Sequence, residues 1–97
     1  MKPYIPTPID TSDIILNDDL VSLTEKLAKN VHDNWAVARI DAGWSFGPER
    51  NDALKQTPCL VEYEKLQESE REYDRATAME TIKVILKMGY SIVLRDK

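Results

Sequence analysis

The sequence has few of the residues that build disulfides, metal sites and membrane spans. Its 97 residues include one cysteine and one histidine, which exclude an intrachain disulfide and leave a zinc site without enough ligands. No apolar run is long enough to cross a bilayer, and no basic and apolar N-terminal segment resembles a secretory signal. We therefore expect a cytoplasmic protein that uses no metal or cofactor and contacts no membrane.

Positive charge and catalytic motifs are also scarce. The chain carries 13 Lys and Arg against 17 Asp and Glu, and this net charge of −4 disfavours a nucleic acid polymer as partner because counterion release needs a cationic surface. Glycine-rich phosphate loops and the EF-hand pattern are absent, and the single cysteine, Cys59, has no histidine near it in sequence. The length fits one compact domain over residues 1–97, and we expect no enzyme activity.

Two long helices are predicted, over residues 17–42 and 69–88. Asn17 or Asp18 suits the cap of the first helix, and Gly43 suits its end. Ser69 and Glu72 form a capping-box pattern at the start of the second helix, although a break at residues 73–75 is an alternative. The expected apolar stripes step by three or four residues and comprise Leu20, Leu23, Leu27, Val31, Trp35 and Ala38, and then Met79, Ile82, Ile85 and Leu86.

The remaining segments are expected to be short. Prolines at positions 3, 6 and 8 predict an extended arm over residues 1–13, held to the domain by Tyr4, Ile5 and Ile9. Residues 14–16 and 91–94 are predicted to pair as a small two-stranded β element joining the termini, and short helices are predicted within residues 50–55 and 60–66. The predicted fold class is mainly α, with two long antiparallel helices, short connecting helices and this β element.

The run from residue 30 to 50 gathers aromatic and cationic side chains around a helix end. His32, Trp35 and Arg39 share one helix face, and a left-handed turn at Gly43 would bring Trp44 and Arg50 beside them. Flat aromatic faces next to cations suit a planar, anionic ligand. These five residues are the predicted ligand-binding site.

Structural alternatives exist for most members of this site. Trp35 also fits the apolar stripe, and His32 is a candidate for packing or capping. Arg39 and Arg50 are candidates for ion pairs with Asp33, Asp52 or Asp74. Trp44 favours a functional role most clearly because helix periodicity does not require an indole in a loop between two glycines.

Several motifs are spaced along the whole chain, and together they form a specific set. They are YIPTPIDT (4–11), NVHDNWA (30–36), Arg39, GWSFG (43–47), RND (50–52), PCLV (58–61), Tyr63 and EREYDR (70–75). With these motifs the sequence resembles the RyR domain, the repeat found as tandem pairs in ryanodine receptor calcium channels and as single copies in bacterial and phage proteins. The chain resembles the single-copy type. It differs from the family pattern at Thr57, where histidine is common, and at Glu62, where proline is common.

The resemblance implies a small, mostly helical and non-catalytic module, which in the channels lies in the cytoplasmic shell and which has been proposed elsewhere as a nucleotide sensor. Our leading prediction is that His32, Trp35, Arg39, Trp44 and Arg50 bind a nucleotide-like small molecule. The rival prediction is a protein-interaction module, in which the same surface contacts a protein partner or a second copy in a homodimer. A concave site would favour the ligand, whereas a flat surface would favour the protein partner.

Overall fold

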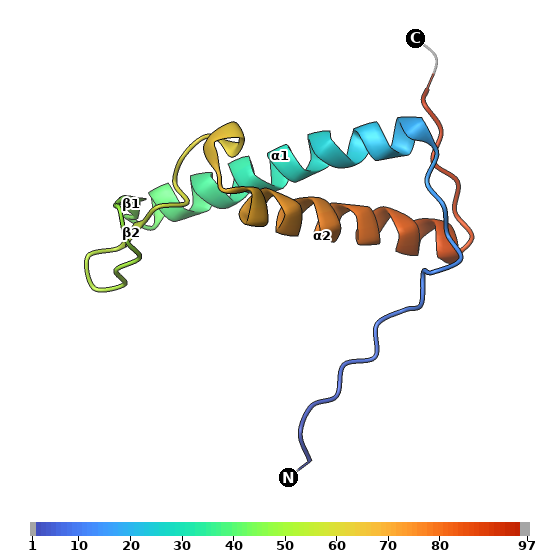
Figure 1. Ribbon diagram of the computed structural model, residues 1–97, viewed down its shortest axis with the longest axis horizontal. Coiled ribbons are helices and arrows are strands. Elements are labelled where there is room, and N and C mark those ends of the chain that lie inside the picture. The colour runs from blue at the N-terminus through green and yellow to red at the C-terminus, as the bar shows by residue number, and fades with distance from the viewer. Residues whose placement is uncertain (1, 96–97) are drawn as a thin grey trace.

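The protein is built on an antiparallel pair of helices. The computed structural model describes residues 2–95, and Figure 1 shows α1 (Asp18–Asp41) lying beside α2 (Glu68–Lys87). The Asn17 side chain accepts the Leu20 N–H at 2.9 Å and so caps α1 as predicted. The predicted capping box of α2 is wrong, because the helix begins one residue earlier, after Gln67, and Ser69 lies inside it. The helix is continuous through residues 73–75.

The buried side of α1 lies one position away from the predicted stripe. Its buried residues follow a strict spacing of four, whereas Val31 and Ala38 are exposed. Two of the four are polar, and the Thr24 hydroxyl is accommodated because it donates to the Leu20 carbonyl at 2.9 Å. On α2, Ile82 is buried as predicted and Ala78 joins it. The buried residues of α1 are Leu20, Thr24, Ala28 and His32.

The connection between the helices contributes the tightest part of the core. The short 3₁₀ helix η1 (Tyr63–Lys65) places Tyr63 and Leu66 against Ala28, which is completely buried. Small size at position 28 allows this close approach. The Tyr63 hydroxyl has no hydrogen-bond partner within the described residues, and burial raises the pKa of this phenol. The predicted short helix in residues 60–66 is therefore present as a 3₁₀ turn.

The β element occurs in this connection and not at the termini. Strand β1 (Ser45–Phe46) pairs in parallel with β2 (Gln56–Thr57), whereas residues 14–16 and 91–94 form no strand. The predicted helix over residues 50–55 is also wrong. Asn51 and Gln56 instead exchange both backbone hydrogen bonds at 2.9 Å and close a tight turn. The fold class, mainly α with a small two-stranded β element, is confirmed.

The arm leaves the helix pair near the end of α2. The Thr11 hydroxyl donates to Glu80 at 2.8 Å, and Asp13 pairs with Lys87 at 3.0 Å, so the base of the arm is fixed. Beyond that point residues 2–10 are extended, and Figure 1 shows them running away from both helices. Tyr4 and Ile5 are 87% and 74% exposed, so the expectation that they hold the arm to the domain is wrong.

Candidate functional site

Helix α1 carries His32, Trp35 and Arg39, and the turn at its end positions Trp44 through backbone hydrogen bonds. Gly43 has φ +93°, and the N–H of Trp44 donates to the Arg39 carbonyl at 2.9 Å while the N–H of Gly43 donates to the Ile40 carbonyl at 3.0 Å. This pair of bonds is the Schellman motif, which turns the chain back over the last helical turn. Trp44 is therefore tied to the residue whose side chain it faces.

The structure brings all five predicted residues together in one column of planar side chains. The His32 and Trp35 rings stack with centroids 5.6 Å apart. The Arg39 guanidinium carbon lies 5.7 Å from the Trp35 ring centroid and 5.3 Å from the Trp44 ring centroid. The Arg50 guanidinium carbon lies 5.5 Å from the Trp44 ring centroid. We call His32, Trp35, Arg39, Trp44 and Arg50 the aromatic–arginine column. Aromatic rings and cations alternate along its outer four members.

The inner end of the column is buried. His32 is 5% exposed, and its Nε2 lies 2.7 Å from the Val61 carbonyl oxygen. Because a carbonyl only accepts, this contact assigns the imidazole proton to Nε2. The Nε2–H is therefore occupied by the backbone, and the ring packs between Trp35 and Tyr63, whose centroid is 6.3 Å away.

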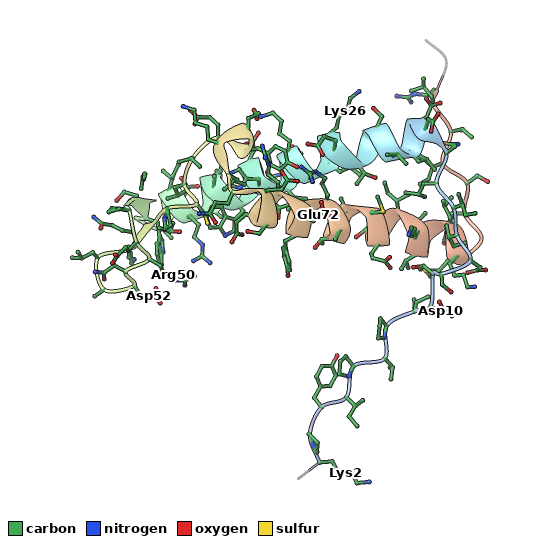
Figure 2. All side chains as sticks on the ribbon, viewed as in Figure 1. Lys2, Asp10, Lys26, Arg50, Asp52 and Glu72 are labelled. Atoms are coloured by element: carbon green, nitrogen blue, oxygen red, sulfur yellow. The ribbon has the colours of Figure 1, made fainter. Side chains whose placement is uncertain are left out.

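The outer end of the column is exposed and carries an ion pair. Figure 2 shows Arg50 and Asp52 in the loop beyond β1 and β2. The Arg50 Nε donates to Asp52 at 2.8 Å, which lowers the pKa of the Asp52 carboxyl and raises the pKa of the Arg50 guanidinium. Of the carboxylate partners considered from the sequence, Asp52 is the one that the structure pairs with Arg50.

Arg39 differs from Arg50 in its surroundings. It is half-buried between the two indoles, and no carboxylate in residues 2–95 lies within ion-pair distance of it. Cation–π contact fixes the plane of its guanidinium but satisfies none of its five N–H donors. Besides Arg50, the Arg39 charge contributes to the lowered pKa of Asp52, but that carboxylate forms its ion pair with Arg50. An ordered cation without an ion pair of its own is the chemical basis of an anion-binding site.

The loop that carries Arg50 is held by contacts that the sequence reasoning missed. The Lys55 ammonium donates to the Ala42 carbonyl at 2.9 Å, which satisfies an open acceptor at the end of α1. Gly47 passes so close to Gln56 that an added Cβ would lie 2.7 Å from the Gln56 Cβ. The only local signal was the glycine itself, because a lysine with φ +53°, as at position 55, has no distinctive sequence pattern.

Two described grooves lie away from the column. These grooves, of about 650 and 450 Å³, lie on the outer face of α2 and beside the start of α1, and no column residue lines either of them. Within residues 2–95, no helix has the length and apolar character needed to cross a membrane, and no cluster of three potential ligands is arranged to hold a metal ion.

The comparison with known families agrees with the motifs that surround the column. The family model described as the RyR domain matches residues 4–94, which include most of the arm, both helices and the whole aromatic–arginine column. The match covers nearly all of the 97 residues. The chain therefore belongs to the RyR domain family.

Proposed function

We propose that this domain is a non-catalytic module that binds a nucleotide-like, anionic small molecule at the aromatic–arginine column. The observation that carries the proposal is Arg39, whose guanidinium is held between Trp35 and Trp44 and has no carboxylate partner in the described part of the chain. A phosphate group that accepted hydrogen bonds from it would supply the missing anion.

The roles of the other residues follow from their exposure and contacts. Arg50 lies against the same indole as Arg39, so its terminal N–H groups add a second set of donors, while its Nε remains with Asp52. The exposed part of Trp44 offers a flat surface for a base. His32 stacks against the Trp35 ring and does not contact the ligand, since its Nε2–H donates to the Val61 carbonyl.

The absence of catalysis is part of the proposal. Cys59, the one thiol, packs against the buried cluster of Ala28, Tyr63 and Leu66. The imidazole proton of His32 is engaged by a backbone carbonyl. Among the hydrogen bonds of residues 2–95, none joins the Cys59 thiol to the His32 ring, as a nucleophile and its base would require.

Isothermal titration calorimetry tests this proposal. The chain is titrated with adenine and guanine nucleotides, cyclic nucleotides and ADP-ribose. Arg39→Ala should weaken binding by a factor of about 10 to 100, because a hydrogen bond to a charged group contributes about 1.5–3 kcal/mol. Trp44→Ala should also weaken binding. Arg95→Ala removes the same charge far along the chain from the column and is the matched control, expected to bind like the parent.

A protein-interaction module is the second candidate, and exposed apolar side chains in the β1–β2 connection favour it. Phe46 of β1 and Leu54 of the loop that carries Arg50 are 52% and 65% exposed, and exposed apolar area of this kind is typical of interface hot spots. Failure of every nucleotide to bind folded protein, together with cross-links from residues 44–54 to a protein partner that Trp44→Ala abolishes, would select this function over ligand binding.

A further inference from the structure

The outer face of α2 carries an apolar groove with no cover. Its volume is about 650 Å³, and its lining runs from the side of α2 away from the buried Ala78, at Tyr73 and Ala76, to the flank beside the buried Ile82, at Ile85. Tyr73 in this lining is 72% exposed. The groove is lined mainly by Tyr73, Ala76, Val84 and Ile85, with Pro8 and Ile9 from the base of the arm at its edge.

The arm presents apolar side chains that match this groove but do not fill it. Tyr4 and Ile5 are 87% and 74% exposed, and Figure 1 shows the arm pointing away from α2. Only the base of the arm, at Pro8 and Ile9, touches the groove edge. Two complementary apolar surfaces are therefore exposed in the same chain.

The arm cannot readily fold back onto its own groove. Pro6 and Pro8 fix φ at two positions, and each proline also restricts the preceding residue to extended conformations, so residues 5–8 form a stiff rod. Below the rod, the Ser12 N–H donates to Asp10 at 2.9 Å and Thr11 is bonded to Glu80. The rod is thus both rigid and fixed at its base in an outward direction, as Figure 2 shows for Lys2 and Asp10.

Length and charge also match the arm to α2. Residues 4–8 in a polyproline helix span roughly 12 Å, and the α2 segment from Tyr73 to Thr81 spans roughly the same distance. Lys2 is the only charged residue in positions 2–9. Glu70, one turn before Tyr73 on the same helix face, has no ion-pair partner within residues 2–95 and offers Lys2 a carboxylate.

We propose that two copies of this chain form a two-fold dimer by exchanging their arms, so that Tyr4 and Ile5 of each copy pack into the α2 groove of the other. The exchange covers the apolar groove and the exposed arm together, and it needs no rearrangement of either helix. A preformed extended segment also loses little conformational entropy when it binds. The aromatic–arginine column takes no part in this contact, so the dimer and ligand binding are separate properties.

Light scattering coupled to gel filtration, over a series of loading concentrations, tests the dimer. The parent chain should approach twice its 11.1 kDa mass as concentration rises. Ile5→Asp in the arm and Ala76→Glu in the groove should each raise the dimer dissociation constant at least about tenfold. Ile15→Asp is the matched control, since Ile15 is 92% exposed and lies outside both surfaces, and it should dimerise like the parent. Unchanged circular dichroism spectra would show that the variants fold.

A mixed disulfide distinguishes exchange between copies from folding back within one copy. In a Cys59→Ala background, an Ile5→Cys chain is mixed with an Ala76→Cys chain, so that the designed bridge can form only between molecules. A disulfide-linked heterodimer is the expected product. A control chain carries both Ile5→Cys and Ala76→Cys. The proposal is overturned if the parent stays monomeric at every concentration, if its dimer survives Ile5→Asp, or if a bridge forms only within the control chain and not between the two single-cysteine chains.

Discussion

At the scale of single residues, His32 shows how a polar side chain can serve the site without touching a ligand. It is buried, stacks on Trp35 and holds the 58–62 segment through its bond to Val61. The same ring therefore links the core beneath Tyr63 to the first aromatic member of the column. The contact fixes Trp35 from the side that faces the core.

We predict that His32→Phe lowers the free energy of unfolding by about 1–3 kcal/mol. Phenylalanine keeps a flat ring beside Trp35 but leaves the Val61 carbonyl without its donor in a partly buried position. Urea denaturation followed by tryptophan fluorescence measures the change. Asn34→Ala, an exposed neighbour on α1, is the control and should unfold like the parent. Equal stability of His32→Phe and the control would contradict the role assigned to this bond.

The gathering of four column residues could be predicted because each step rests on local rules, whereas Arg50 reaches the column through loop contacts that the sequence does not reveal. Helix spacing places His32, Trp35 and Arg39 on one face, and the glycine at position 43 predicts the turn that returns Trp44 to it. The engagement of His32 could not be predicted, because its acceptor lies 29 residues away in the chain. The sequence also could not decide which arginine forms an ion pair, since Asp33, Asp52 and Asp74 were all candidate partners.

At the scale of secondary-structure elements, the two helices are joined by a network centred on Arg75. Its Nε pairs with Glu25 of α1 at 2.8 Å, and its Nη1 pairs with Glu68 at 2.9 Å and Glu72 at 2.7 Å. Three carboxylates raise the pKa of this guanidinium. Most of these ion-pair partners are exposed, so the network orients the helices more than it stabilises them.

We predict that Arg75→Gln makes the domain less stable at neutral pH and that this difference shrinks in acid. Hydrogen bonds from Arg75 and Arg71 lower the pKa of Glu68 in the folded state below its usual 4.5. A lowered carboxyl pKa contributes stability above the unfolded pKa and loses it as the pH falls through the folded pKa. Melting temperatures of parent and variant, measured from neutral pH to below pH 4, should therefore converge.

The control for this experiment is Lys26→Gln, which removes one positive charge from α1 at a residue with no ion pair in the described part of the chain. The difference in melting temperature between Lys26→Gln and the parent should be small and nearly independent of pH. A difference in melting temperature between the parent and Arg75→Gln that stays constant across the acid range would contradict the prediction, because the contribution of Arg75 would then not depend on ionised carboxylates.

Elements with strong local signals were predicted well, and those that depend on distant contacts were not. Asn17 and Gly43 place the bounds of α1 correctly to within one residue. The β element was misplaced because residues 14–16 and 91–94 have strand-like apolar runs, whereas the true strands have two residues each and arise from the closure of a loop on the end of α1. Strands this short carry no periodic pattern.

At the scale of the whole molecule, the chain is more extended than a compact domain of its length. Its radius of gyration is 16.8 Å, against about 13 Å for a compact domain of similar size. Figure 1 shows that the arm and the segment after α2 both extend from the helix pair, which accounts for this shape. Burial is concentrated where α1, α2 and η1 meet.

Hydrogen exchange in dilute solution should reveal this unequal distribution. We predict the slowest amides in the central parts of α1 and α2, around Thr24, Ala28 and Ile82, because their opening requires separation of the helices. Residues 2–10 and 48–50 should exchange at rates near those of an unfolded chain, since they lie outside the helices and strands. Mass spectrometry of short proteolytic fragments can resolve these regions. Uniform protection along the chain would contradict this picture.

The chain enters and leaves the helix pair at the same end, while the column lies at the other end. The Asp13–Lys87 ion pair marks the shared end, and Figure 1 shows β1 and β2 at the far tip of the hairpin. A polypeptide joined before residue 2 or after residue 95 would therefore be attached at a distance from the aromatic–arginine column. This geometry suits the domain to engineering as a modular sensor, in which fluorescent proteins fused at both ends would leave the recognition surface uncovered.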